Sequence, residues 1–225
     1  MIVVFVESWN NQFKKASFEA VSYARSWANT AGCGVRAITS ASVENTNQLA
    51  QYGADEIATL ELAQTGAGIG AQFAGIVGDA QGVVVAGTAM GKIIAPTLAA
   101  LTSGALSTNT TNTPTSTSPV VVERGAFSSK GIETISLSNG MPIISFVPNT
   151  IGIKEEAGTG TMISADAEGL DKLTVNEVSV AAGKVVLPEA EIVVSAGRGL
   201  KGPENWGMIE ELANVLGAAT ACSKP

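Results

Sequence analysis

The sequence predicts an α/β fold in which helices flank a mostly parallel sheet, an antiparallel hairpin is added, and an incomplete Rossmann-like strand-turn-helix-strand unit follows. Three observations support this prediction. Runs of β-branched residues alternate with helical segments over roughly the first hundred residues, which is typical of βαβ units. Further along, two such runs flank a short turn-forming segment, which predicts a hairpin. At the C-terminal end, a strand leads through a glycine-rich turn into a helix.

The first elements follow one another in regular alternation. Ile2–Val6 is a continuous apolar run, as expected of a strand buried on both faces. Gln12–Ala31 carries apolar residues at helical spacing and ends in a glycine-containing segment. The same reasoning predicts three more strands and three more helices: strands at Gly34–Ser40, Glu56–Leu60 and Gly82–Ala86, and helices at Asn45–Tyr52, Ile69–Val77 and Gly91–Leu101.

The alternation ends at an uncharged segment rich in serine, threonine and asparagine, Ser103–Pro119. This segment predicts a strand followed by an exposed loop, and a Ser/Thr linker is the alternative. Val120–Glu123 and Ile132–Leu137 flank the turn of the hairpin, and Pro142–Val147 supplies a further strand. The acidic, glycine-rich stretch Gly152–Asp171 is expected to be surface or hinge.

We therefore expect two domains, residues 1–185 and residues 186–225. The first should fold independently, because its alternating strands and helices can close a core of their own.

Composition and charge exclude several classes of protein. A net charge of -7 and a sequence pI near 4.7 argue against a nucleic-acid partner. The N-terminus lacks the basic region of a signal peptide. The longest apolar stretch is interrupted by Lys92 and Pro96, so no membrane insertion is expected. Cys33 and Cys222 form no paired motif. We expect a cytoplasmic protein.

The chain contains no histidine. This removes Ser-His-Asp and Cys-His nucleophiles and histidine metal sites. The acidic run Ala165–Asp171 misses the spacing of a calcium loop, and no serine has a lysine in the S-x-x-K arrangement. No catalytic nucleophile is found, and the chain is not expected to be an enzyme.

Gly87–Ile93 resembles a phosphate-binding loop in its position between a strand and a helix. A P-loop needs four residues between its glycines and Ser or Thr after its lysine, whereas this segment has three residues and then Ile93. An ordinary glycine turn is the better interpretation. The segment still supports an alternative function, that of a stand-alone adenine-nucleotide-binding α/β domain.

Gly197, Gly199 and Gly202 spell G-x-G-x-x-G after an expected buried strand at Ile192–Ser195 and before an expected helix at Glu204–Leu216. The free N–H groups of such a helix favour an anion. A nicotinamide-binding domain would place an acidic residue at the end of the next strand, and here that strand, Ala218–Cys222, is followed by Ser223 and Lys224. A cation at this position favours phosphate or an electron-rich ring.

The segment VVSAGRGLKGPENWGMIEELANVLGAATACSKP closely resembles the start of the flavin-binding domain of the electron transfer flavoprotein alpha subunit. The family pattern runs V-V-S-G-G-R-G, then E-N-F, a helix ending L-A-x-x-L-G-A-A, and S-R. The resemblance continues upstream in YGADEI, in GTAMGKIIAPTLAALTSGAL, and in the first strand with Glu7.

This resemblance implies that FAD is the cofactor and that Arg198, Ser223 and Lys224, with Gly197 and Gly199 beside them, contact it. It implies an electron carrier that pairs with a beta subunit, accepts electrons from dehydrogenases and passes them to a quinone reductase or another acceptor. The family has Arg where this chain has Lys224, and an ammonium lacks the flat fork of a guanidinium. The resemblance also implies that the sequence stops inside the FAD domain, so we expect that this chain alone does not retain FAD.

Overall fold

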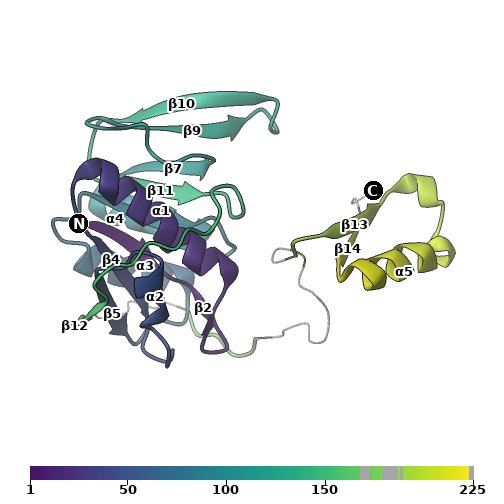
Figure 1. The fold of residues 1–225 in the computed structure, drawn as a ribbon, viewed down its shortest axis with the longest axis horizontal. Helices are drawn as coiled ribbons and strands as arrows, with labels where there is room; N and C mark the ends of the chain where they lie inside the picture. The colour runs from purple at the N-terminus through teal and green to yellow at the C-terminus, as the bar shows by residue number, and fades with distance from the viewer. Residues whose placement is uncertain (168–172, 179–186, 188–189, 223–225) are drawn as a thin grey trace. The chain divides into compact units, whose positions relative to one another are not determined.

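The computed structural model describes residues 1–167, 173–178, 187 and 190–222 (Figure 1). The chain divides into two compact units, Met1–Val175 and Asn176–Pro225. The predicted domain boundary, between residues 185 and 186, lies outside the described residues, and each unit is treated separately below.

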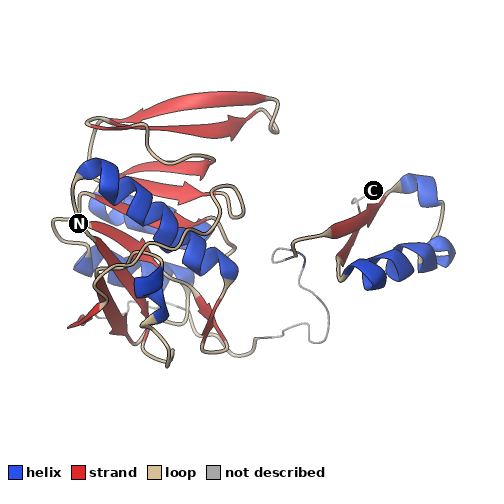
Figure 2. Cartoon of the chain, in the orientation of Figure 1, coloured by secondary structure: helices blue, strands red, loops and turns tan. Residues whose placement is uncertain are grey.

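The first unit is built on one large sheet with the strand order β10-β9-β7-β11-β6-β1-β4-β5-β12 (Figures 1 and 2). Neighbours from β7 to β12 pair in parallel, as predicted, and β9 pairs antiparallel with β10, β7 and β8. The strands of the parallel part are β1 (Ile2–Phe5), β4 (Val35–Ser40), β5 (Glu56–Leu60), β6 (Gly82–Ala86), β7 (Ala105–Thr110), β11 (Pro142–Phe146) and β12 (Thr161–Ser164).

Helices cover both faces of this sheet. Successive side chains of β1 point to opposite faces and pack against different helices. Ile2 and Val4 pack in one cluster with Trp27 of the long helix α1, whereas Val3 and Phe5 pack in a second cluster with residues of two other helices. All four residues of β1 are buried, as predicted for a central parallel strand. The helices are α1 (Lys15–Ala31), α2 (Gln48–Gln51), α3 (Gly66–Ile76) and α4 (Gly91–Thr102).

Several predicted helix boundaries in this unit shift by up to three residues, and strand β12 was not predicted. The first helix begins at Lys15, because the residues before it form a small hairpin of β2 (Ser8–Trp9) and β3 (Gln12–Phe13). Asn10 and Asn11 both take left-handed conformations at its turn, as asparagine does readily. The stretch expected to be surface or hinge contains β12, which pairs in parallel with β5 at the edge of the sheet.

The predicted hairpin is confirmed, with strands longer than expected: β9 (Val120–Ala126) and β10 (Gly131–Leu137). The polar segment before it forms β7 and the short strand β8 (Ser116–Thr117), so the linker alternative is wrong. Hydroxyl groups can be buried in β7 because they bond to each other, as Ser107 Oγ and Thr110 Oγ1 do at 3.1 Å.

Residues 149–160, which we call the strap, connect β11 toward β12 and are bound to α1. The buried carboxylate of Glu19 accepts backbone N–H groups of the strap from Asn149 at 2.7 Å, Ile151 at 2.9 Å and Gly152 at 3.0 Å. Ser22 exchanges two hydrogen bonds with the backbone of Lys154, each of 3.0 Å. The connection from β11 to β12 therefore runs along α1 as an extended strap and not as a helix.

Asp55 links α1 to the sheet, since its Oδ2 accepts from Arg25 Nη2 at 2.6 Å and from the Val35 N–H at 2.9 Å. Burial favours a raised pKa for this carboxyl, but the Val35 and Arg25 hydrogen bonds and the Arg25 charge outweigh it, so its pKa is lowered. A lowered folded-state pKa stabilises the fold above the unfolded-state pKa of about 3.9. That stabilisation is lost as the pH falls through the folded-state pKa.

Replacing Asp55 with asparagine should therefore reduce thermal stability near neutral pH, because the charged partner of Arg25 is removed. The difference between parent and Asp55→Asn should shrink steadily below about pH 4, where the parent carboxyl becomes protonated. Calorimetric melting of both proteins across this range measures the effect. A difference that stays constant into acid would contradict the assignment.

The second unit is the predicted strand-turn-helix-strand arrangement (Figure 2). β13 (Val193–Ala196) pairs in parallel with β14 (Ala219–Cys222), and α5 (Gly207–Leu216) connects them. The helix begins at Gly207, later than predicted, because two 3-10 turns, Arg198–Leu200 and Pro203–Asn205, precede it. β13 is half exposed in this unit, so the expectation of a buried strand is wrong for the described residues.

Candidate functional site

A cavity of about 580 Å³ lies at the carboxyl ends of the two strands of the second unit. Its lining unites the strand end, the glycine turn and the residue before α5: Ala196, Gly197, Arg198, Leu200, Lys201, Gly202, Pro203, Trp206 and Cys222. Gly197 and Arg198, predicted as site residues, line it. Gly199 lies in the same turn without lining it. The carboxyl ends of parallel strands are where α/β folds bind ligands.

Strand pairing explains why residues far apart in sequence share this cavity. Ala196, the last residue of β13, pairs with Cys222, the last residue of β14. The end of the second strand therefore lies beside the start of the glycine turn. Ser223 and Lys224, the other predicted site residues, lie outside the described residues.

The loop between β13 and α5 bonds mostly to itself. The N–H groups of Leu200, Lys201 and Gly202 donate to loop carbonyls at Gly197 (3.0 Å), Arg198 (3.1 Å) and Leu200 (2.8 Å) respectively. The 3-10 turn Pro203–Asn205 is likewise closed by hydrogen bonds between its own backbone groups. The side-chain amide of Asn205 donates to the Leu200 carbonyl, at the end of the turn Arg198–Leu200, at 2.8 Å. These bonds hold the Arg198 and Lys201 backbone at the cavity.

The glycines of this loop do not occupy left-handed positions. Gly197 and Gly202 have φ values of -129° and -170°, which other residues also adopt. Within the described part of the loop, the left-handed residue is Lys201, at φ 65° and ψ -30°. A non-glycine residue in this region is uncommon and is frequently found at functional sites.

Sequence reasoning missed Lys201, Trp206 and Cys222. The indole of Trp206 is half buried at the cavity, and both Arg198 and Lys201 are exposed there. An aromatic residue a few positions after a glycine turn was a signal that could have identified Trp206, since aromatic rings stack on bases and flavins. Nothing in the sequence indicated Cys222, because its place depends on the pairing of two strands.

The first unit has its own candidate crevice, between β1 and β6, where the order of the strands reverses. Its own side chains fill it. Thr88 Oγ1 donates to the Glu7 carboxylate at 2.5 Å and accepts the Gly91 N–H, at the start of α4, at 3.0 Å. The remaining space is about 10 Å³, no more than one water molecule requires.

Gly87–Ile93 is confirmed as a glycine turn between β6 and α4. A Cβ atom on Gly91 would lie 1.9 Å from the carbonyl oxygen of Ala86, so only glycine fits where the chain turns into the helix. Because the Glu7 carboxylate already occupies the place of an anion there, this crevice gives no support to the adenine-nucleotide alternative.

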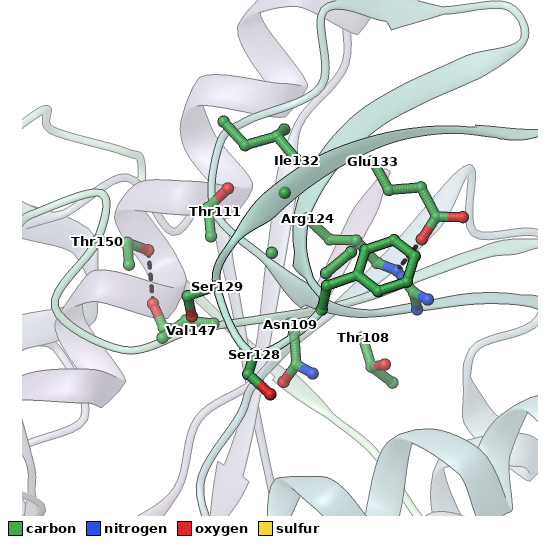
Figure 3. A pocket seen from close by; sticks show the side chains of 14 residues that line it. Thr108, Asn109, Thr111, Arg124, Ser128, Ser129, Ile132, Glu133, Val147 and Thr150 are labelled. Atoms are coloured by element: carbon green, nitrogen blue, oxygen red, sulfur yellow. Dashed lines mark hydrogen bonds and ion pairs between the residues drawn. The ribbon is translucent and has the colours of Figure 1, made fainter.

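A third hollow, of about 1170 Å³, is open and lies beside the tip of the β9–β10 hairpin (Figure 3). Its charged side chains are paired with each other, since Arg124 Nε donates to Glu133 Oε2 at 2.9 Å. Thr150 Oγ1 donates to the Val147 carbonyl at 2.6 Å. The hairpin also presents two exposed apolar side chains, Phe127 and Ile132. These features suit a contact surface better than a reaction site.

Two further observations limit the chemistry of the described residues. They contain no cluster of three or more histidine, cysteine or carboxylate side chains that could hold a metal ion. None of the helices they form is long and apolar enough to cross a membrane.

The fold and the cavity define a two-part α/β protein whose second unit is a glycine-turn βαβ unit of the nucleotide-binding class. Comparison with protein families identifies it further. The electron transfer flavoprotein domain matches residues 2–182, and the electron transfer flavoprotein FAD-binding domain matches residues 186–225. The chain belongs to the electron transfer flavoprotein family and is an alpha-type subunit of it.

Curated relatives agree over nearly the whole chain. It is 30% identical to the electron transfer flavoprotein subunit alpha of Bacillus subtilis, over 99% of this chain and 72% of the relative. It is 27% identical to the electron transfer flavoprotein subunit alpha of Syntrophomonas wolfei, over 98% of this chain and 72% of the relative. It is 26% identical to the subunit LctC of a lactate dehydrogenase (NAD(+),ferredoxin) of Acetobacterium woodii, over 100% of this chain and 57% of the relative. Alpha subunits of this family are electron carriers rather than conventional enzymes.

Proposed function

We propose that this chain binds FAD at the cavity of the second unit and serves as the alpha subunit of a heterodimeric electron carrier. The observation that supports this most is positional: the FAD-binding family match covers the residues that form the cavity. FAD supplies the redox chemistry, because its flavin ring takes up and releases electrons. The chain itself binds and orients the cofactor.

The lining residues fit such a ligand. Arg198 and Lys201 complement the negative charge of a pyrophosphate, and no carboxylate lines the cavity in the described part of the chain. Leu200, Pro203 and Trp206 offer apolar and aromatic surface to a flat ring. The electron donors would be dehydrogenases, and the acceptor a quinone reductase or another carrier, as the resemblance implies.

We further propose that FAD binds to this 225-residue chain weakly and reversibly. The cavity of the second unit is open, and elsewhere in this unit the apolar side chains of Val193, Leu212 and Val215 remain exposed. The purified chain should therefore lack the visible absorbance of stoichiometric flavin. Added FAD should bind saturably and be removed by dialysis. Stoichiometric flavin after purification would contradict the weak-binding proposal, and no binding at any FAD concentration would contradict the proposed site.

The proposed partner of the first unit is a beta subunit, and the β9–β10 hairpin is the surface we propose for it. Phe127 and Ile132 are 86% and 76% exposed on this hairpin, beside an open hollow. Large apolar side chains that are exposed on the surface favour a protein contact. Burial of such a side chain contributes roughly 1.5–3 kcal/mol.

Replacing both residues, Phe127→Ser with Ile132→Thr, should lower the affinity for the beta subunit by about tenfold or more, given ~1.4 kcal/mol per decade. Calorimetric titration of the two purified subunits measures this. Leu101→Ser is the matched control, because Leu101 is 59% exposed on α4, away from the hairpin. Unchanged affinity in the double variant, or an equal loss in the control, would rule out the hairpin.

A further inference from the structure

Several amides of the loop at the cavity are bonded within the loop and cannot hold an anion. In dinucleotide-binding turns, backbone N–H groups and the start of the following helix point at the pyrophosphate. Here the N–H groups of Leu200, Lys201 and Gly202 are committed to carbonyls of the loop itself. α5 begins only at Gly207, beyond a second turn whose Trp206 N–H donates to the Pro203 carbonyl at 3.0 Å. These amides cannot hold an anion, so side chains must contribute to anion binding at this cavity.

Two cationic side chains are available for that task. Arg198 and Lys201 begin and follow the same 3-10 turn, and both line the cavity. Among the described residues, neither is paired with a carboxylate. Two exposed, unpaired cations at one cavity are notable in a chain with a net charge of -7.

The backbone at Lys201 adds an independent observation. Lys201 holds the left-handed position of the loop, which glycine occupies without strain, although Gly202 is its neighbour. The hydrogen bonds of the loop impose this conformation, and a lysine adopts it at a cost that glycine would not have. Uncommon backbone conformations of this kind are often found at functional sites.

We propose that Lys201 is a phosphate-binding residue, whose ammonium holds the phosphates of the dinucleotide together with the Arg198 guanidinium. This inference rests on the proposed FAD site and names a residue that the G-R-G and S-K positions do not include. An ammonium acts as a point charge without ring recognition. Lys201 therefore contributes to the binding of any ligand carrying phosphate and contributes nothing to the flavin ring.

The test uses ligands that separate these parts: ADP, FMN and riboflavin, which has the ring without phosphate. Each is titrated into the 225-residue chain labelled with 5-fluorotryptophan. Trp206 lines the cavity, and its ¹⁹F signal is assigned by Trp206→Phe. The variants are Lys201→Gly, which removes the charge and suits the left-handed backbone, and Lys201→Arg, which keeps the charge. Lys130→Gly, in the hairpin turn, is the control.

Lys201→Gly should weaken the binding of ADP and of FMN about tenfold, because one charge-assisted contact to phosphate is lost. It should leave riboflavin unchanged and should melt at the parent's temperature. Lys201→Arg and Lys130→Gly should bind like the parent. An equal loss for riboflavin would mean that Lys201 only shapes the loop, and no loss for ADP would place it outside the site. Either result overturns this proposal alone, whereas absence of any ligand-induced shift in the parent overturns the FAD site and the proposal together.

Discussion

Replacing Glu19 with alanine is expected to lower the free energy of unfolding of the first unit by roughly 2–4 kcal/mol. The Glu19 carboxylate is 1% exposed and accepts three backbone N–H groups of the strap, at Asn149, Ile151 and Gly152. A hydrogen bond to a charged group contributes about 1.5–3 kcal/mol, and water can replace part of it where the strap is exposed. A loss of this size is a large fraction of the stability of an ordinary domain.

Chemical denaturation of parent and variants measures this loss. The free energy of unfolding of Glu19→Gln should fall between those of the parent and of Glu19→Ala, because glutamine keeps an acceptor oxygen but places an amide donor beside the N–H groups of the strap. Glu44→Ala is the matched control, since Glu44 is exposed on the same unit. If Glu19→Ala unfolded at the same denaturant concentration as Glu44→Ala, the strap would not depend on this carboxylate.

Replacing Arg198 with alanine is expected to weaken FAD binding by one to two orders of magnitude. Arg198 follows directly on the glycine at the end of β13 and lines the cavity. Its guanidinium can make charge-assisted hydrogen bonds to phosphate or flavin oxygens, each contributing about 1.5–3 kcal/mol. At ~1.4 kcal/mol per decade, the loss of one such bond gives the expected range.

Equilibrium dialysis with FAD measures this effect. The melting temperature of the first unit should not change, because Arg198 belongs to the second unit. Arg124→Ala is the arginine control, since that side chain is paired with Glu133 in the hairpin. Equal FAD affinity in Arg198→Ala and parent would make Arg198 an ordinary surface residue at a strand end.

The parallel core was predictable because its strands are short runs of β-branched residues. Glu56–Leu60 and Gly82–Ala86 form strands with the predicted boundaries. The hairpin at residues 8–13 was missed because its second strand, Gln12–Phe13, was assigned to the start of the predicted helix. β12 was missed because four residues at a sheet edge carry little periodic signal, and their pairing with β5 is a tertiary contact.

The site was predictable in part. The G-R-G sequence and the family resemblance predicted Arg198 as a site residue, and Arg198 lines the cavity of the second unit. The expectation that the free N–H groups of the following helix face an anion at the glycine turn does not apply, because two 3-10 turns precede the helix and it begins only at Gly207. Lys201 could not be predicted, since its left-handed conformation arises from hydrogen bonds within the loop.

The most direct test of the FAD site is to titrate FAD into the ¹⁵N-labelled chain and follow amide chemical shifts. The cavity of the second unit and the crevice between β1 and β6 predict different maps of shifted amides. Binding at the proposed site should shift amides from Ala196 to Trp206 and at Cys222, and leave those around Glu7 and Thr88 unchanged. Shifts at Glu7, Thr88 and Gly91 with an unchanged second unit would contradict the account and restore the first unit as the nucleotide site.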